Sequence, residues 1–393
     1  MTSIKKLDII ANKPVRLIIG LMSGTSLDGL DIAFCRFKGK GPETEVEVLN
    51  FKTQSYSTEF QEAIRKVFAQ RKIDLQELCL LNAFIARKHA AYINNALADW
   101  NVESNDVDLI ASHGQTIYHA PARQHRIEGM PDATLQIGDG DHIARLTGII
   151  TVSDFRQKHV AAGGEGAPLA VYGDYLIFSS KEENRVMLNI GGIANFTYLP
   201  KSLNPVEVMC TDVGPGNTLS DAFVRANFPG KRYDEGGEIA SKGKANNNLL
   251  EALLEDSFFN QTFPKTTGPE VFNLEFLKNA LTKSGTGNLA SGDILATLNS
   301  FTARAIALAL KSLKVKDYVI YASGGGIHNK TLLSKLQDAL QGITIKTTQS
   351  LGINPDAKEA VLFASLANEC VSGVPLQIGG VPAVRLGKIS LPD

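Results

Sequence analysis

The chain has 393 residues, more than the size at which a single hydrophobic core usually stops growing, so two domains are expected. Apolar residues make up 44% and charged residues 21%, which excludes disordered and collagen-like classes. The 40 basic and 41 acidic residues leave a formal net charge of -1, so no overall field favours nucleic acid or an anionic membrane.

The cysteines and the N-terminus indicate a reducing compartment. Cys35, Cys79, Cys210 and Cys370 are scattered without a C-x-x-C spacing, which argues against a disulfide framework or a zinc site and favours buried structural thiols. Residues 1–15 contain no apolar signal region, and no later stretch approaches the ~18 apolar residues of a membrane span. We therefore expect a cytoplasmic protein.

The first half of the chain predicts strands with helices between them. Apolar and alternating runs predict strands at residues 16–22, 30–37, 46–55, 108–112 and 148–152. The last two runs end near polar residues, which is typical of buried parallel strands whose carboxyl ends meet a ligand. These five strands form one α/β domain.

Two helices are predicted between the third and fourth strands. Apolar residues at helical spacing follow Thr58, which is a suitable N-cap, up to residue 68. A longer helix is predicted to begin after Asp74 and to run toward Trp100.

The second half repeats the order of the first. It predicts a strand, a glycine turn and two more strands, then helices and two final strands. The strands fall at residues 185–190, 193–199, 206–211, 318–322 and 343–347, and the helices at residues 217–226 and 293–313. The repeat predicts a domain at residues 1–183 and a second at 184–393, with a surface insertion at 229–287 and a short tail from residue 371.

The turn after the first strand combines glycines, hydroxyls and carboxylates within residues 20–31. Glycine lets backbone N–H groups approach an anion, and hydroxyls add further donors. The turn lacks the G-x-x-x-x-G-K-S/T pattern of a P-loop and does not open a dinucleotide-binding helix. It predicts a phosphate-binding turn, with a plain hairpin turn as the alternative.

Three further segments of the second half are candidates for nucleotide contact. Gly191 and Gly192 occupy the turn that corresponds to the first one. Asp212 is predicted at the end of a strand, where the following glycines and helix N-terminus offer donors to phosphate; an N-capping aspartate is the alternative. The glycines at 324–326 permit an adenine ring to lie on the backbone, with a flexible loop as the alternative.

His113 is predicted at the end of the fourth strand, where polar groups would line a cleft. A lone histidine is often structural, so a substrate contact and a structural role both stay open. The pattern of the sequence alone does not select Arg156 or Glu359, because most such residues face solvent.

Six motifs in one order closely resemble the anhydro-N-acetylmuramic acid kinase family, within the actin, chaperone-ATPase and sugar-kinase superfamily. They are residues 21–29 (LMSGTSLDG), 112–116 (SHGQT), 154–156 (DFR), 161–169 (AAGGEGAPL), 188–192 (LNIGG) and 214–217 (GPGN). The resemblance runs from about residue 20 to residue 366. It implies an α/β fold of duplicated RNase H-like domains (actin-like ATPase and sugar kinase) around a central cleft.

The resemblance also implies roles for particular residues. Asp212 would be the general base, and His113, Gln115, Arg156 and Glu359 would contact the sugar. For the Mg²⁺ that accompanies ATP, Asp28 is our candidate anchor through water. The ATP contacts that the resemblance implies are Gly24, Thr25, Ser26, Leu27, Asp28, Gly29, Leu30 and Asp31. The glycine turns of the second half add Gly191, Gly192, Gly214, Gly216, Asn217, Gly324, Gly325 and Gly326 as candidate contacts. One departure is Val213, where the family commonly has threonine, so one hydroxyl beside the base is missing. A homodimer is implied as well.

The implied reaction uses ATP to open the 1,6-anhydro bridge of anhydro-N-acetylmuramic acid with water while phosphorylating O6, in the recycling of cell-wall murein. An alternative is a kinase of the same fold for another anhydrosugar such as levoglucosan. A non-enzymatic ATP-driven clamp would need a peptide-binding domain, and only 23 residues follow Cys370.

Overall fold

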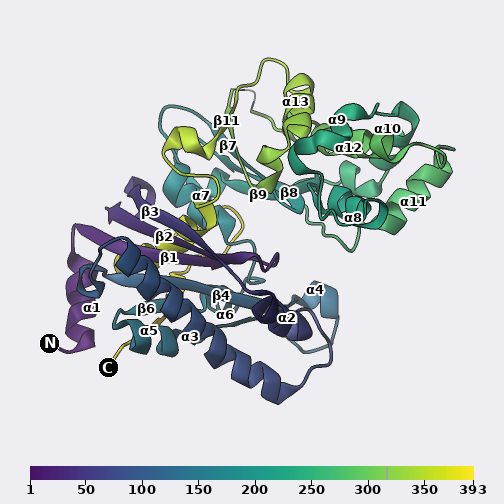
Figure 1. The fold of residues 1–393 in the computed structure, drawn as a ribbon. Helices are drawn as coiled ribbons and strands as arrows, with labels where there is room; N and C mark the ends of the chain where they lie inside the picture. Colours follow the sequence, from purple (N-terminus) through teal and green to yellow (C-terminus); the bar gives the residue numbers. More distant parts are fainter. Residues whose placement is uncertain (316) are drawn as a thin grey trace. The chain divides into compact units, whose positions relative to one another are not determined.

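The computed structural model of the chain describes residues 1–315 and 317–393. They divide into two compact units, each with its own β-sheet and hydrophobic core. The first unit comprises Met1–Ser179, Leu203–Glu207 and Gly352–Asp393, and the second comprises Ser180–Ser202 and Val208–Leu351. Figure 1 shows both as ribbons.

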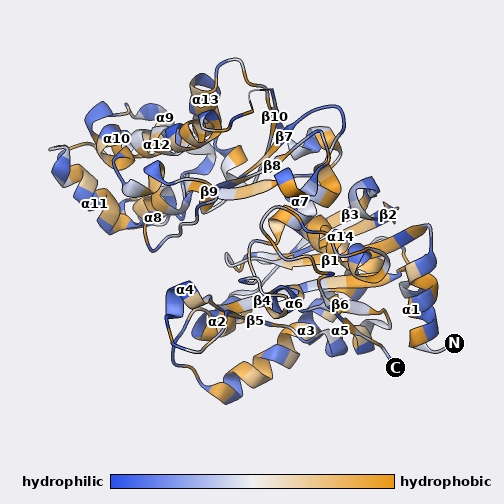
Figure 2. Ribbon diagram, turned by 180° about the vertical axis from the view of Figure 1, so that it is seen from behind, coloured by the Kyte–Doolittle hydropathy of each residue, from blue (hydrophilic) through white to orange (hydrophobic). Residues whose placement is uncertain are grey.

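The sheet of the first unit has the strand order β12-β6-β4-β1-β2-β3, and β5 pairs with β4. β2 is antiparallel to β1 and β3, whereas β4 is parallel to β1 and β6. The strands are β1 (Val15–Ser23), β2 (Gly29–Lys38), β3 (Glu45–Ser55), β4 (Leu109–Ala120), β5 (Ala133–Ile137), β6 (Thr151–Ser153) and β12 (Lys388–Ser390). Figure 2 shows the apolar character of β1, whose residues are almost all buried.

Helices pack against this sheet: α14 contacts β1, β2 and β4, and α3 contacts α5 and β5. The approach of α14 to β1 requires Gly20, because a Cβ at this position would lie 1.9 Å from the carbonyl oxygen of Ala360. The helices of the unit are α1 (Ser3–Asn12), α2 (Thr58–Val67), α3 (Leu75–Asp99), α4 (Ala122–His125), α5 (Gly140–Thr147), α6 (Phe155–Ala161), α7 (Ala170–Phe178) and α14 (Lys358–Ser372).

The sheet of the second unit has the order β9-β8-β7-β10-β11, with two antiparallel pairings followed by two parallel ones. It repeats the order and directions of β3-β2-β1-β4-β6, which confirms the predicted duplication. The strands are β7 (Arg185–Ile190), β8 (Ile193–Leu199), β9 (Met209–Pro215), β10 (Val319–Ser323) and β11 (Ile345–Thr347). The helices are α8 (Thr218–Asn227), α9 (Glu238–Lys242), α10 (Asn247–Leu254), α11 (Leu274–Lys283), α12 (Ser291–Lys311) and α13 (Lys330–Ala339).

The predicted insertion at residues 229–287 is more than a surface loop. Its helices α9, α10 and α11 form a hydrophobic cluster with α8 and α12, in which Leu249, Leu253, Phe258 and Phe272 are buried. The insertion therefore contributes to a second hydrophobic core of this unit, which it shares with α8 and α12.

Helix α12 corrects the expectation that no stretch has the length and apolar character of a membrane span. Its 21 residues meet both criteria, and 78% of its most apolar 18-residue stretch is buried inside the protein. Its residues from Ile294 to Leu310 contribute to both hydrophobic clusters of the second unit, so it packs as a core helix.

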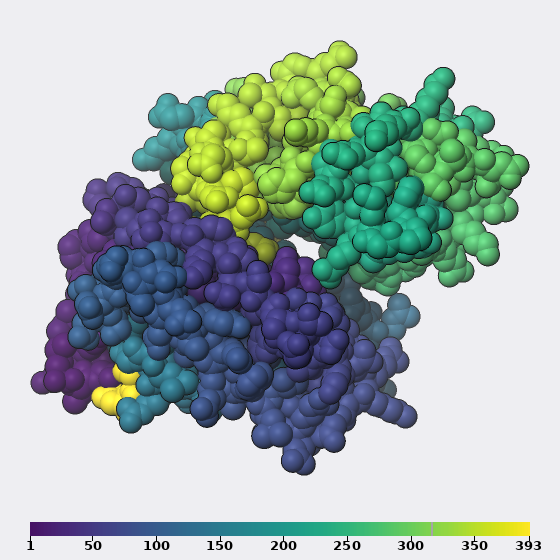
Figure 3. All heavy atoms as spheres, viewed as in Figure 1, coloured from purple at the N-terminus to yellow at the C-terminus, as the bar shows by residue number. Residues whose placement is uncertain are grey.

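The C-terminal segment differs most from the predicted organisation. The predicted second domain runs to residue 393, whereas Gly352–Asp393 packs with the first unit, because α14 lies on β1 and β12 pairs antiparallel with β6. The Ser3 amide donates to Asp393 Oδ2 at 3.2 Å. In Figure 3 the last residues, in yellow, lie beside the purple N-terminal helix and teal α5.

Several local predictions were wrong at element ends. Ser57, not Thr58, caps α2, since its side chain accepts from the Phe60 amide at 3.3 Å. β9 begins at Met209 rather than residue 206, because Pro205–Glu207 forms a 3₁₀ turn. β4 continues beyond His113 to pair with β5, which the sequence did not indicate. The expectation of buried thiols holds for Cys35 but not for Cys79, which is exposed.

Candidate active site

The β1–β2 turn exposes hydroxyls and backbone at the end of the central strand of the first unit. Thr25, Ser26 and Asp28 are exposed, whereas Leu27 is 2% exposed and anchors the turn in a left-handed conformation with φ of 59°. Ser26 Oγ donates to Asp28 Oδ1 at 2.7 Å. An apolar anchor beneath exposed polar groups is an arrangement that can hold an anion at a fixed place.

A buried hydrogen-bond chain holds this turn from below. Ser23 Oγ donates to Gln115 Oε1 at 2.6 Å and accepts from Tyr56 Oη at 2.8 Å, and Tyr56 Oη lies 2.8 Å from His89 Nε2. Gln115 is fully buried, and its amide also donates to the Gly24 carbonyl at 3.4 Å. The structure thus places Gln115, a predicted sugar contact, beneath the β1–β2 turn, which it supports.

Asp31 lies beside the turn in a negative environment. Burial raises its pKa to about 6, a hydrogen bond of 2.6 Å from Thr53 Oγ1 opposes the rise, and the charges of Asp28, Glu359 and Asp356 add to it. Carboxylates that repel one another in this way favour a bound cation. No group of three or more His, Cys, Asp or Glu within residues 1–315 and 317–393 could hold a metal ion without other ligands.

His113 has a fixed tautomer. Nδ1 lies 2.9 Å from the Gly114 carbonyl, to which it must donate, and Nε2 accepts from Arg156 Nε at 2.9 Å. Burial and the guanidinium of Arg156 lower the pKa of His113 to about 3, so the ring is neutral. The ring also packs on Phe363 of α14, with centroids 4.7 Å apart.

Arg156 and Glu359 complete this cluster within the first unit. Arg156 Nη1 donates to the Gly166 carbonyl at 2.9 Å, and Nη2 makes no hydrogen bond within the described part of the chain. Glu359 is accessible to solvent, yet the protein around it raises its pKa by desolvation, while Lys358 and Arg156 oppose the rise. Arg156 thus links His113, by a hydrogen bond, with Glu359, by charge.

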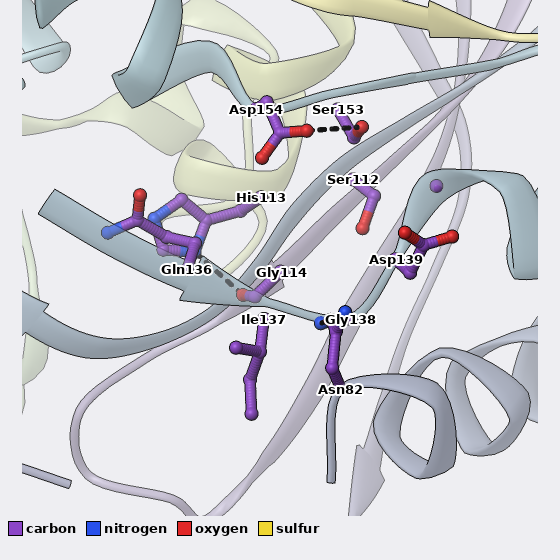
Figure 4. Close-up of a pocket in the computed structure, with 11 residues that line it drawn as sticks. Asn82, Ser112, His113, Gly114, Gln136, Ile137, Gly138, Asp139, Ser153 and Asp154 are labelled. Atoms are coloured by element: carbon purple, nitrogen blue, oxygen red, sulfur yellow. Dashed lines mark hydrogen bonds between the residues drawn. The ribbon is translucent and has the colours of Figure 1, made fainter. Parts of the chain in front are cut away.

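A polar cavity of about 180 Å³ adjoins His113 in the middle of β4 and the carboxyl end of β6 (Figure 4). Two buried oxygens that line it, Ser112 Oγ and Gln136 Oε1, have no hydrogen-bond partner within the described residues. Oxygen acceptors dominate the lining, which suits a ligand rich in hydroxyl or N–H donors. The other lining residues were not predicted as site residues, although three of them belong to the motifs SHGQT and DFR: Asn82, Ser112, Gly114, Gln136, Ile137, Gly138, Asp139, Gly140, Ser153 and Asp154.

In the second unit, the glycine turn between β7 and β8 is hydrogen-bonded to the glycine segment that precedes α8. The amides of Gly216, Asn217 and Thr218 donate to the carbonyls of Gly191 or Gly192 at 2.8–3.1 Å. The sequence predicted that these N–H donors at the start of α8 would be free to bind phosphate. The structure shows instead that they donate to carbonyls of the β7–β8 turn. A Cβ on Gly216 would lie 2.2 Å from the Gly191 oxygen, so only glycine permits this approach.

Asp212 lies inside β9, opposite Asn195, and not at its end as predicted. It is not an N-cap either, because Asn217 occupies that position of α8. Its amide donates to the Lys265 carbonyl at 3.0 Å, and its Oδ2 accepts from the Thr267 amide at 2.9 Å. The segment around Lys265 therefore fixes the orientation of the half-buried carboxylate.

Lys265 anchors that segment. The side chain is 8% exposed, Nζ donates to the Phe258 carbonyl at 2.9 Å and lies 4.2 Å from the centroid of the Phe258 ring. Burial lowers the pKa of this lysine. The lysine and its aromatic surroundings belong to the predicted insertion, where sequence analysis assigned no site residue.

The glycines at 324–326 turn the chain tightly against β7. A Cβ on Gly324, whose φ is 83°, would lie 2.5 Å from Asn189 Oδ1, and one on Gly326 would lie 2.3 Å from Ile190 Cγ2. Gly325 alone has room above it, since its nearest neighbour would be Asn217 Nδ2 at 3.9 Å. Of the three glycines, Gly325 is the one that leaves backbone open to a flat ligand.

Comparisons with known proteins agree with the motifs. The family model described as "Anhydro-N-acetylmuramic acid kinase" matches residues 16–389. A protein of that name from Pseudoalteromonas atlantica is 53% identical over 390 residues, covering 98% of this chain and 97% of the relative. Another, from Caldanaerobacter subterraneus, is 40% identical and covers 97% of this chain and 98% of its own length. The chain belongs to the anhydro-N-acetylmuramic acid kinase family.

Proposed function

We propose that the chain is an ATP-dependent kinase that opens 1,6-anhydro-N-acetylmuramic acid with water and phosphorylates O6. The products are N-acetylmuramic acid 6-phosphate and ADP. Family membership over nearly the whole chain supports this assignment. The structural observation that carries the mechanism is the orientation of Asp212, whose Oδ2 is held by the Thr267 amide.

Asp212 acts as the general base in this proposal. Its carboxylate takes a proton from a water molecule as the water oxygen bonds to C1 of the sugar. The bond from C1 to O6 breaks, and O6 attacks the γ-phosphorus of ATP while the bond to the ADP oxygen breaks. O6 needs no separate base, since it leaves the ring as a developing alkoxide.

The two glycine-bearing turns are the proposed sites of phosphate contact, at Gly24–Asp31 in the first unit and at Gly191 and Gly192 in the second. Mg²⁺ would neutralise charge on the transferred phosphate. Asp28 and Asp31 would hold it through water, since Mg²⁺ usually keeps several waters and is bound by one or two carboxylates with phosphate oxygens. The high pKa of Asp31 supports a cation at this place.

The sugar would lie against His113, Arg156 and Glu359, with its hydroxyl or amide donors directed into the acceptor-lined cavity. The unpartnered oxygens of Ser112 and Gln136 support this placement. We further propose a homodimer, because of the family resemblance, which light scattering can test. The scattered cysteines and the balanced charge lead us to propose a cytoplasmic protein that binds neither nucleic acid nor membrane, and pull-down experiments can test these partners.

The Asp212→Asn variant tests the central role of the base. We expect turnover to fall by about 10²- to 10⁴-fold, because general bases contribute that much, while ATP binding stays unchanged. ADP release from anhydro-N-acetylmuramic acid and from levoglucosan should be measured by a coupled assay. Asp338→Asn, an exposed aspartate on α13, is the matched control.

Near-normal turnover of Asp212→Asn would remove this residue from the mechanism. Preferential turnover of levoglucosan by the unmodified protein would instead favour the other anhydrosugar kinase.

A further inference from the structure

Two buried polar residues of the first unit, Tyr56 and His89, have no part in the proposed reaction. Tyr56 follows β3 and is 5% exposed, and His89 lies in α3 and is fully buried. Tyr56 belongs to the hydrophobic cluster of this unit, and His89 shares a face of α3 with Ile85 and Ile93, which belong to it as well. Nδ1 of His89 has no hydrogen-bond partner in the described part of the chain. A buried acceptor without a partner costs folding free energy, so the stability of the core does not account for this pair.

The hydrogen bonds that join these two residues to the β1–β2 turn all run in one direction. Ser23 Oγ gives its only proton to Gln115 Oε1, so its oxygen accepts from Tyr56 Oη. The Tyr56 hydroxyl also has a single proton, and its oxygen therefore accepts from His89 Nε2. Burial lowers the pKa of His89 to about 4, so the ring is neutral and carries its proton on Nε2. Each donor thus points toward the turn, from His89 through Tyr56 and Ser23 to Gln115.

Tyr56 holds the β1–β2 turn at both of its ends. Its hydroxyl donates to Ser23, the last residue of β1, at 2.8 Å. Its backbone amide donates at 3.1 Å to the carbonyl of Asp28, which directly precedes β2. Thr25 and Ser26, which are exposed, lie between these two points. A change at Tyr56 is therefore expected to move the turn that carries them.

Gln115, at the other end of the chain of hydrogen bonds, sets the direction of one peptide group in the turn. Its side-chain amide donates to the Gly24 carbonyl at 3.4 Å from the buried side, and the Leu27 amide donates to the same oxygen at 3.4 Å. The peptide bond between Gly24 and Thr25 is trans, and in a trans peptide the C=O and N–H groups point in opposite directions. The Thr25 N–H group therefore points away from Gln115. The amides of Thr25 and Ser26 have no hydrogen-bond partner among the described residues, so they are available to a ligand.

We propose that Tyr56 and His89 are positioning residues for the nucleotide phosphates, because the chain of donors that they begin holds the β1–β2 turn with its unpaired N–H groups directed outward. N–H groups that are already fixed in direction need less reorganisation when an anion binds. The inference rests on the proposed function for the identity of the ligand. It makes Gln115 the last member of this chain and not a sugar contact.

Binding of two nucleotides that differ in the β- and γ-phosphates tests this role. Titration calorimetry with Mg²⁺ compares the non-hydrolysable ATP analogue AMP-PNP with AMP. In Tyr56→Phe the affinity for AMP-PNP should fall by about 2- to 10-fold, the usual worth of one hydrogen bond, because the turn loses its support at Ser23. The affinity for AMP should stay unchanged, since AMP lacks the phosphates that would contact the turn.

Tyr175→Phe is the matched control. Tyr175 is 1% exposed, and its hydroxyl donates to the Leu203 carbonyl at 2.8 Å, so this variant also loses the hydrogen bond of a buried tyrosine that takes no part in the chain beneath the turn. Both affinities should be unchanged in it. His89→Leu should weaken AMP-PNP binding in the same selective way, and His89→Gln, which can keep a donor, should restore it. The two His89 variants decide the matter if Tyr56→Phe does not fold.

Folded variants Tyr56→Phe and His89→Leu that keep the full preference for AMP-PNP, or that lose affinity for both nucleotides equally, would overturn the positioning role. Equal binding of both nucleotides by the unmodified protein would remove the phosphate site, and the inference with it. A selective loss of AMP-PNP affinity in a protein that does not turn over anhydro-N-acetylmuramic acid would instead contradict the proposed reaction and support the positioning role.

Discussion

At the scale of single residues, the site depends on side chains held by neighbours that no motif indicates. Asp212 could be selected from the sequence because it precedes G-P-G-N. The orientation of its carboxylate could not be predicted. The amide of Thr267 and the carbonyl of Lys265, more than 50 residues later, set it. Which group a backbone amide bonds depends on how a distant loop packs beside the strand. The composition of the loop does not predict this packing.

Asp31 makes a prediction about pH at this same scale. Its folded pKa of about 6 is above the ordinary value of 3.8, so the folded state binds the proton more tightly than the unfolded state. The stability due to Asp31 is therefore complete below about pH 4 and is lost as pH rises through about 6. Asp31→Asn has no carboxyl group at this position, so it does not lose this stability as pH rises. The melting temperature of the variant minus that of the unmodified protein should therefore increase from pH 4 to pH 8.

The measurement is a series of thermal melts without nucleotide or Mg²⁺, with Asp338→Asn as the control. A constant difference between Asp31→Asn and the unmodified protein across this range would contradict the raised pKa. Nucleotide affinity in the presence of Mg²⁺ should weaken in the same variant if Asp31 helps to hold the cation.

At the scale of elements, long apolar runs were predictable and short strands were not. β7 and β8 match the predicted ranges because their β-branched and aromatic runs are bounded by a glycine turn. β5 was not predicted because its burial does not follow residue polarity: Thr134 is buried and Leu135 is exposed. β12 has three residues, too few to show a period of two.

The contact of α14 with β1 gives a prediction for an element. Gly20→Ala places a methyl group 1.9 Å from the Ala360 carbonyl oxygen, so α14 must move away from the strand. Overpacking of this kind typically costs about 1–3 kcal/mol, which urea unfolding can measure. Gly287→Ala, where a Cβ would meet nothing within 4 Å, should leave the free energy of unfolding nearly unchanged. Equal effects of both substitutions would show that this contact is not tight.

At the scale of the whole molecule, the duplication was predictable but the path of the chain through the two units was not. Element order repeats along the sequence, and the sheets repeat it in space. Nothing in the composition of residues 352–393 shows which sheet they join, because a largely apolar helix such as α14, in which every residue from Ala360 to Glu369 is buried, can pack against either one. The cavity beside His113 could not be predicted from the sequence either, since its walls come from α3, α5 and three strands.

Removal of residues 388–393 tests the role of the C-terminus in the first unit. The deletion exposes the edge of β6 and removes the contact of Asp393 with Ser3. We expect the melting temperature to fall by several degrees, since about 1 kcal/mol corresponds to roughly 2–4 °C in a unit of this size. Removal of residues 391–393 alone keeps β12 and should have a smaller effect. Equal melting temperatures for both deletions would show that β12 adds little.

The return of the chain to its first sheet also constrains biosynthesis. Ribosomes deliver β6 more than 230 residues before its partner β12, and the whole second unit is made in between. Domains usually fold from the N-terminus during synthesis. In this chain the edge of β6 stays unpaired until β12 is synthesised at the end of translation. Nascent chains stalled before residue 388 should accordingly recruit holding chaperones at the β6 edge, whereas the second unit can mature while still tethered.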